Sequence, residues 1–334
     1  MDFYNQSNHS ATGSTSLTHD PIWDIISIVN FFFVGGPLCL LGMCTNIANI
    51  IVYTKMGFLE TANVNFLVLS VFDFFYSLFA FLLRACFNTL LRDLSIGPRL
   101  RYVSHCVSIA IVAFIGGSAM MTALIATERC ICVIFPLKLK TLLTQRRSLC
   151  LTLTVVFYHA AFLTLIYSDP GPPYDAHPEK LSFYYFSMYV IPSTTCFFIV
   201  IITTAILAIK LRRNQRWRRE TTTQGGKASV KEDKLVKTIV AICTLFIICS
   251  FPNASMFIAQ IVYPPLRYGT SDLRAVTLRI FDLSFIFQSV SASVNIFFYY
   301  RMSSKYKKAF SVCFAWCAMR KTNTSHAMKT KNFD

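Results

Sequence analysis

The chain has 334 residues, of which 54% are hydrophobic and only 14% are charged, and its formal net charge at pH 7 is +16. A soluble protein of this length carries more charge, and its apolar residues alternate with polar ones instead of gathering in long blocks. The composition therefore excludes an ordinary soluble domain and indicates a membrane protein.

A polar segment, residues 1–24, precedes the first apolar block. Two sequons, Asn5-Gln6-Ser7 and Asn8-His9-Ser10, predict N-glycosylation of Asn5 and Asn8 if this segment is extracellular. No basic stretch followed by a short apolar core is present, so we expect no cleavable signal peptide. The first apolar block would then direct its own insertion.

Seven apolar blocks follow, each close to or above the length of about 20 residues that a membrane-spanning helix needs. They are residues 25–53, 64–91, 103–135, 149–167, 183–211, 235–263 and 273–300. We predict an all-α membrane protein, a seven-transmembrane helix bundle with a short amphipathic eighth helix, in which residues 25–302 form the transmembrane domain.

Basic residues gather in every second connection: at Lys55, in residues 138–147 and 210–234, and from Arg301 onward. Because cytoplasmic loops carry the excess of Lys and Arg, these segments are expected to face the cytoplasm. The prediction is a multi-pass plasma-membrane protein, in contact with the lipid bilayer, with its N-terminus extracellular and its C-terminus cytoplasmic. This charge distribution argues against nucleic acid as a partner.

Residues 303–317 read as the amphipathic helix, which we expect to lie on the membrane surface. Its aromatic face and its basic residues are Tyr306, Phe310 and Phe314, and Lys305, Lys307 and Lys308. Cys313 and Cys317 are candidates for palmitoylation, the alternative being free thiols. Residues 318–334 would form a cytoplasmic tail.

Charged and amide side chains inside the apolar blocks need a reason to be there. Asp73 lies in the middle of the second block, where a carboxylate costs about 2.5–3.5 kcal/mol on insertion scales. Glu128 and Arg129 stand side by side at the end of the third block. Arg129 follows Ser118 by three helical turns, so both fall on nearly the same face, about 16 Å apart. We read these residues as functional, the alternatives being a tolerated acid and a structural ion pair.

Together these residues resemble the rhodopsin-like (class A) G-protein-coupled receptors over most of the chain. Glu128-Arg129-Cys130 is similar to the Asp/Glu-Arg-Tyr motif of that family. Further signature positions of the family are matched by Asn46, Asp73, Pro136, Pro192, Pro252, and Asn295 with Tyr299. The chain looks most like invertebrate, molluscan, chemosensory and peptide receptors.

The resemblance implies a two-state switch that contacts a heterotrimeric G protein. Glu128 would hold Arg129 at rest, and outward movement of helix 6 about Pro252 would free it. The residues implied in the G-protein contact and the switch are Glu128, Arg129, Glu232, Asn295 and Tyr299.

The resemblance also implies an allosteric sodium ion, while no cofactor is required. A hard cation takes oxygen ligands, and the residues that match the family's sodium pocket are Asp73, Ser118, Asn295, Ser291 and Asn46. The alternative is a hydrated polar network without an ion.

Three positions depart from the family's pattern. Ser250 stands where the family has Trp before the helix 6 proline, Ile296 where it has Pro after the helix 7 Asn, and Val200 where helix 5 has an inward tyrosine. The usual disulfide from helix 3 to the second outer loop has no partner in that loop. Cys86 and Cys106 are expected at similar depth on adjacent helices, so either they form a bridge or both are free thiols.

The family's ligand site would lie in the outer half of the bundle. Ile111 replaces the Asp of amine receptors and Ser289 replaces the retinal Lys of opsins, which disfavours monoamines and retinal. Polar candidates, each of which has packing as the alternative role, are Arg84, His105, Gln260, Arg279, Asp282 and Gln288. Arg84 and Arg279 would suit an anionic group and Asp282 a cation. We expect an extracellular peptide or small-molecule ligand.

An enzyme is not expected, because the chain shows no metal-binding spacing, no Gly-rich phosphate loop and no nucleophile elbow. The alternative function is an ion channel or transporter with seven spans. Against it, the halves show no inverted repeat and no helices carry strings of charged residues.

Overall fold

The computed structural model describes residues 25–26, 28–87, 97–135, 144–168, 183, 185–221, 227–268 and 271–315. Asn5, Asn8, Pro136 and Cys317 lie outside this part of the chain, as do the segments 1–24 and 318–334. His105 and Glu232 lie on described helices, but their side chains are not described.

The described residues are almost entirely helical. The elements in chain order are η1 (Asn30–Val34), α2 (Gly35–Met56), α3 (Thr61–Phe87), α5 (Gly97–Ile134), α7 (Gln145–Tyr167), η3 (Phe186–Val190), α9 (Ile191–Thr221), α10 (Lys227–Val262), α11 (Pro265–Tyr268) and α12 (Ser271–Met302), followed by an eighth helix over residues 304–315. Seven of these helical stretches are long and apolar enough to cross a bilayer. The predicted seven-helix bundle with a short eighth helix is confirmed.

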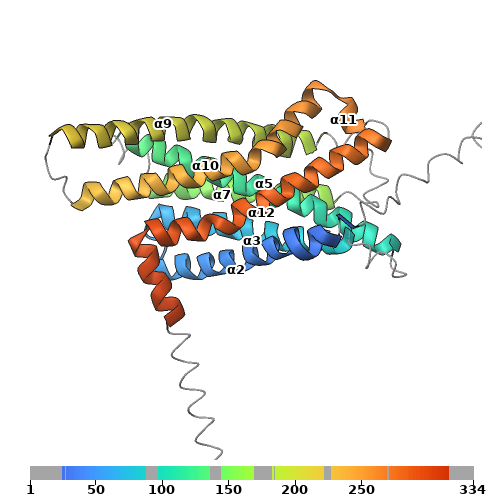
Figure 1. Ribbon diagram of the computed structural model, residues 1–334, viewed down its shortest axis with the longest axis horizontal. Helices are drawn as coiled ribbons and strands as arrows, with labels where there is room; N and C mark the ends of the chain where they lie inside the picture. Colours follow the sequence, from blue (N-terminus) through green and yellow to red (C-terminus); the bar gives the residue numbers. More distant parts are fainter. Residues whose placement is uncertain are drawn as a thin grey trace, which may run out of the picture.

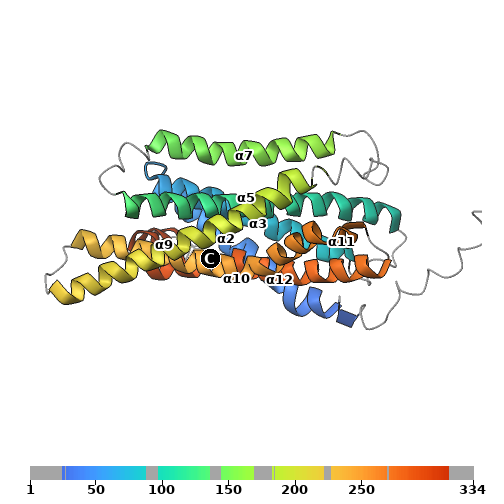
Figure 2. The ribbon, with the colours of Figure 1, turned by 90° about the horizontal axis from the view of Figure 1, so that it is seen from above.

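Helix α5 runs through the middle of the bundle and α7 lies on its outside (Figure 2). In the most apolar window of α5, 72% of the residues are buried, against 17% in α7. In Figure 1, α9 and α10 lie toward the top and α2 toward the bottom, and α12 runs obliquely from α11 to α2. Because α5 touches most of the other helices, its side chains can contact partners from both sides.

The bundle has two ends, which we name after the residues they carry. At the Arg84 end, α3 ends, and α10 turns through α11 into α12. At the Glu128 end, α2, α5 and α12 end, and the eighth helix turns sharply away from α12 (Figure 1).

The eighth helix is attached to the bundle by Tyr306, whose side chain is fully buried. The Tyr306 hydroxyl donates a hydrogen bond to Asn49 Oδ1 at 2.5 Å. Its ring packs against the rings of Tyr53 and Tyr299, with centroids 5.3 and 5.7 Å apart. An exposed ion pair between Lys305 and Glu60 adds a second connection. The eighth helix is thus fixed to α2 and α12.

The two helix prolines are accommodated differently. Pro252 lies inside α10, where it removes one backbone hydrogen bond and loosens the helix. Pro192 is the second residue of α9, directly after the π-helical turn η3. A wide turn therefore precedes Pro192, whose missing N–H is tolerated in a first helical turn.

Helices α3 and α5 approach closely where α5 has a glycine. A Cβ added to Gly117 would lie 2.7 Å from the Phe72 ring atom Cζ, closer than side-chain carbons pack. Asp73, the next residue of α3, is thereby held against α5.

Candidate functional site

Asp73 is the centre of a buried polar site formed by three helices. Its side chain is 1% exposed. Ser118 Oγ of α5 donates to Asp73 Oδ1 at 2.6 Å, and Asn295 Nδ2 of α12 donates to Asp73 Oδ2 at 2.9 Å. A buried carboxylate is costly unless its oxygens are paired, so these donors explain how α3 tolerates the acid. The structure brings together three of the five residues that we associated with sodium.

The other two residues lie beside this site. Asn46 Nδ2 donates to the carbonyl oxygens of Gly42 and Ala292, at 2.9 and 3.0 Å. Ser291 is buried on α12, one turn before Asn295. Within the described part of the chain, no hydrogen bond joins Asn46 or Ser291 to Asp73.

One carboxylate, a hydroxyl and an amide form a donor set that fits a monovalent hard cation. The described residues contain no cluster of three or more His, Cys, Asp or Glu that would hold a more highly charged ion. The sodium ion therefore remains a prediction that the geometry permits.

Glu128 makes a second buried polar site, ten residues after Ser118 and near the end of α5. Its side chain is 5% exposed and accepts hydrogen bonds from Asn65 Nδ2 of α3, at 2.8 Å, and from Ser148 Oγ of α7. Thr152 Oγ1 donates to Asn65 Oδ1 at 2.7 Å. Glu128 thus connects α5 to α3 and α7.

The expected ion pair between Glu128 and Arg129 is absent from the described residues. Neighbouring residues on a helix do not face each other, and both oxygens of Glu128 are already occupied. Arg129 Nε is buried without a hydrogen-bond partner, and so is the hydroxyl of Tyr299. In this conformation Arg129 is not held by Glu128, which corrects that part of the predicted switch.

Our sequence reasoning did not identify Asn65, Ser148 and Thr152 as partners of Glu128. A signal was present, because polar side chains inside apolar blocks need hydrogen-bond partners. The sequence does not show which of the many Ser and Thr residues turn toward the acid and which bond to their own helix.

Cys86 and Cys106 are free thiols, each partly exposed. The alternative that joined them in a disulfide is therefore wrong for this structure. Equal depth on adjacent helices does not make two side chains face each other, which a disulfide requires. Cys313 is likewise a free thiol in the eighth helix, which leaves its palmitoylation a prediction.

A cavity opens between α5, α9, α10 and α12. Its empty space is about 320 Å³ when open solvent is included, and its enclosed part has room for about one water molecule. It is lined by Ile115, Ala119, Ser193, Thr194, Phe197, Phe246, Ser250, Asn253, Ala254, Phe257 and Gln288. Ser193 Oγ, Thr194 Oγ1 and Asn253 Oδ1 are buried there without a hydrogen-bond partner. Apolar walls with a few convergent polar groups are typical of small-molecule sites.

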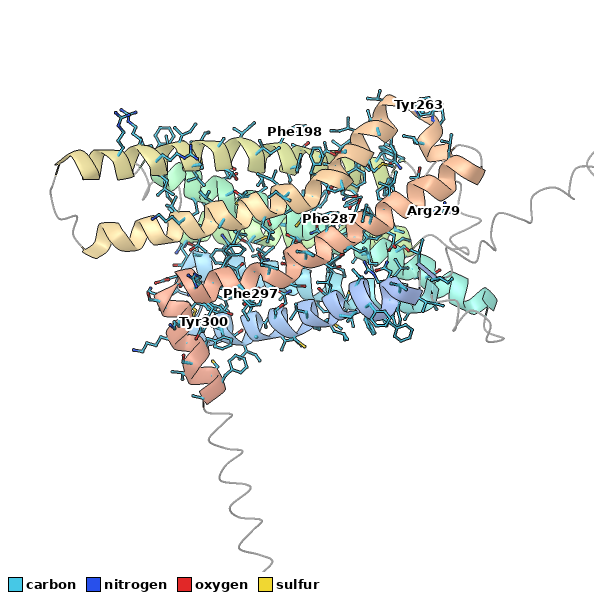
Figure 3. The ribbon with its side chains drawn as sticks, viewed as in Figure 1. Phe198, Tyr263, Arg279, Phe287, Phe297 and Tyr300 are labelled. Atoms are coloured by element: carbon cyan, nitrogen blue, oxygen red, sulfur yellow. The ribbon has the colours of Figure 1, made fainter. Side chains whose placement is uncertain are left out.

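Among the predicted ligand residues whose side chains are described, only Gln288 lines the cavity. Ile111 is fully buried in a neighbouring apolar cluster. Arg279 lies on α12 toward α11 (Figure 3), and Gln260 is buried on α10. Asp282 is exposed and accepts a hydrogen bond from Asn30.

Comparison with known proteins bears on both fold and class. Residues 172–317, less than half of the chain, match the family model described as serpentine type 7TM GPCR chemoreceptor Srw. Among solved structures, squid rhodopsin superposes with a TM-score of 0.59 and 19% sequence identity, over 88% of this chain and 87% of that one. No curated protein matches the chain.

The chain is therefore similar to serpentine chemoreceptors in its sequence and to rhodopsin in its fold. Its seven candidate membrane spans and rhodopsin-like fold agree with the match to serpentine chemoreceptors in the C-terminal half. Receptors of that family have a ligand and a G protein as partners in general, which for this chain is a matter of proposal. The narrower expectation of a molluscan receptor is not supported, because a likeness at 19% identity shows only the fold.

Proposed function

We propose that this receptor binds a soluble extracellular molecule in the cavity between α5, α9, α10 and α12. Binding would move the Glu128 end of α10 outward and activate a heterotrimeric G protein. The Arg84 end would face the outside of the plasma membrane, since the basic residues of the sequence gather in the connections at the other end. The observation that carries this proposal is the position of the cavity beside Pro252.

The lining of the cavity suits a small organic molecule, or one side chain of a peptide, and the cavity would widen to admit either. Most of its lining is apolar, and its unpaired polar atoms, on Ser193, Thr194 and Asn253, can orient a group that enters. Ser250 stands where the family's pattern has Trp, and it also lines the cavity. The small side chain leaves room that an indole would fill.

The coupling between the cavity and the other end would run through α10. Ser250 and Asn253 line the cavity on either side of Pro252, where the helix lacks a backbone hydrogen bond. A ligand that pushes on these residues bends α10 at its weakest point, and its inner end then moves away from α5. Arg129, which Glu128 does not hold, would then contact the G protein. The ligand shifts a two-state equilibrium only if it binds the bent state more tightly.

The test is a ligand screen in cells that express the full chain with a promiscuous G protein. Exposure to odorants and tissue extracts should raise second messengers, and Arg129→Ala should abolish the response at equal surface expression. Currents or uptake that persist when G proteins are inhibited would instead establish the channel or transporter function and overturn the proposal.

A second experiment tests the cavity itself. Ala254→Phe should fill the cavity and reduce agonist potency at least tenfold, because one overlapping methylene group already costs about 1–3 kcal/mol in a packed site. The matched control is Phe251→Leu on the same helix, since Phe251 is 62% exposed and turned away from the cavity. If both variants respond like the wild type, the ligand binds elsewhere.

A further inference from the structure

Arg84 is a buried cation that the proposed cavity does not use. It lies in the last turn of α3, and its side chain is 8% exposed. A guanidinium within the apolar part of a helix bundle is costly unless it pairs with another group. The partners of its three guanidinium nitrogens therefore decide its role.

One nitrogen of Arg84 is anchored inside the bundle. Nη1 donates to Cys39 Sγ of α2 and to the carbonyl oxygen of Ala80, both at 3.3 Å. Cys39 in turn contacts Ser289 Oγ of α12 at 3.7 Å, and Ser289 Oγ lies 3.0 Å from the Tyr76 hydroxyl. This chain of polar groups from three helices holds the guanidinium in one orientation.

The other two nitrogens, Nε and Nη2, are buried and have no hydrogen-bond partner. These two nitrogens form one edge of the planar guanidinium, the edge that donates two parallel hydrogen bonds to a carboxylate. Within the described part of the chain, no carboxylate oxygen lies within 4.0 Å of Arg84. The bidentate edge is therefore fixed in place and unpaired.

The missing side chain of Gly35 makes room for this edge. A Cβ added to Gly35 would lie 2.8 Å from Arg84 Cδ and would overlap Nε. The same Cβ would lie 2.6 Å from Asn30 Oδ1, and Asn30 Nδ2 donates to Asp282 Oδ2 at 2.8 Å in an exposed hydrogen bond. Arg84 thus lies one layer beneath the surface at its end of the bundle.

We propose that the Nε–Nη2 edge of Arg84 binds a carboxylate group of the extracellular ligand. This deepens the proposed function and rests on it, since the ligand must enter from the Arg84 end. The carboxylate makes two charge-assisted hydrogen bonds with the guanidinium. Asp282 is the rival partner, because a shift of the Asn30–Asp282 pair would bring an internal carboxylate toward the same edge.

The experiment uses the purified full chain in nanodiscs of phosphatidylcholine and measures its thermal unfolding. The probes are a series of sodium n-alkanoates and the matched n-alkanamides, at constant ionic strength. We expect an alkanoate at ten times its dissociation constant to raise Tm by roughly 2–4 °C, whereas its amide does not. Arg84→Gln should remove this rise. Arg84→Lys, which keeps the charge but not the fork, should weaken alkanoate binding about tenfold.

Asp282→Asn separates the ligand from the internal partner. If Arg84 binds an external carboxylate, this variant keeps or strengthens the alkanoate response, because a nearby negative charge is removed. If Asp282→Asn and Arg84→Gln lower Tm equally and the wild type shows no alkanoate response, Arg84 has an internal partner and the proposal is overturned. Protection by anionic lipid in the nanodisc, without any by alkanoates, would also overturn it. If the receptor activates a G protein in cells but binds no alkanoate, the carboxylate site at Arg84 is refuted and the proposed function stands.

Discussion

Ser118 of α5 donates a hydrogen bond to Asp73 of α3, with 2.6 Å between Oγ and Oδ1. This bond lies on the same face of α5 as Arg129, three turns away, so one helix connects the buried acid to the end where we place the G protein. A change in the charge or hydration of Asp73 therefore acts on the helix that carries the proposed output.

Asp73→Asn should remove any stabilisation of the receptor by sodium. The wild type should unfold at a higher temperature in sodium chloride than in choline chloride, because a carboxylate attracts the cation and an amide does not. Thermal unfolding of the purified chain in both salts measures the difference. Asp282→Asn, which removes an exposed acid, is the control and should keep the sodium effect. If the sodium effect survives Asp73→Asn, sodium binds elsewhere and the polar network around Asp73 holds no ion.

Ser148→Ala should destabilise the receptor by about 1–3 kcal/mol, because it leaves a buried oxygen of Glu128 without its donor. Arg129→Gln should change the free energy of unfolding by less than about 0.5 kcal/mol, because Arg129 makes no ion pair with Glu128 here. Thermal unfolding of the wild type and the two variants measures both changes in stability. An Arg129→Gln cost as large as that of Ser148→Ala would restore the ion pair that the sequence suggested.

Tyr306→Phe should loosen the eighth helix and cost about 1–2 kcal/mol, because Asn49 Oδ1 loses its donor. Burial raises the pKa of Tyr306 above its ordinary value, so the hydroxyl, which is protonated at neutral pH in any case, also keeps its proton in more alkaline solution. Hydrogen exchange of the backbone amides of residues 304–315 would report the loosening. Tyr300→Phe is the matched control, because Tyr300 is 40% exposed, and it should leave exchange unchanged.

Gly117→Ala should destabilise the receptor by about 1–3 kcal/mol through overlap with the Phe72 ring. Phe72→Leu should recover part of that cost when the two changes are combined, since the smaller side chain yields the space. Unfolding temperatures of the wild type, both single variants and the double variant measure the coupling. Strict additivity of the two changes would mean that the helices separate instead of repacking.

The difference between the two polar sites shows how far sequence reasoning reaches. Asp73, Ser118 and Asn295 were grouped by a family resemblance, and the structure brings them within hydrogen-bond distance. For Glu128 the resemblance suggested Arg129, whereas the structure supplies Asn65 and Ser148. A resemblance transfers positions, but the partner of a side chain depends on which neighbouring helix presents a donor at the same depth.

The sequence by itself determined the class of the protein. Blocks of about 20 apolar residues can satisfy their backbone in a bilayer only as helices, so seven blocks predict seven spans without any tertiary information. The aromatic face of residues 303–317 likewise predicted the eighth helix, seen over residues 304–315.

Only the tertiary structure decided which polar groups meet. Arg84 was one of several candidate residues in the sequence, and its two unpaired nitrogens appear only once Cys39 and Gly35 are packed against it. The cavity beside Pro252 and the free thiols of Cys86 and Cys106 were likewise visible only in the tertiary structure. The physical reason is that hydrophobicity along the chain sets the depth of each residue, whereas the rotation of each helix about its axis is set by packing against its neighbours.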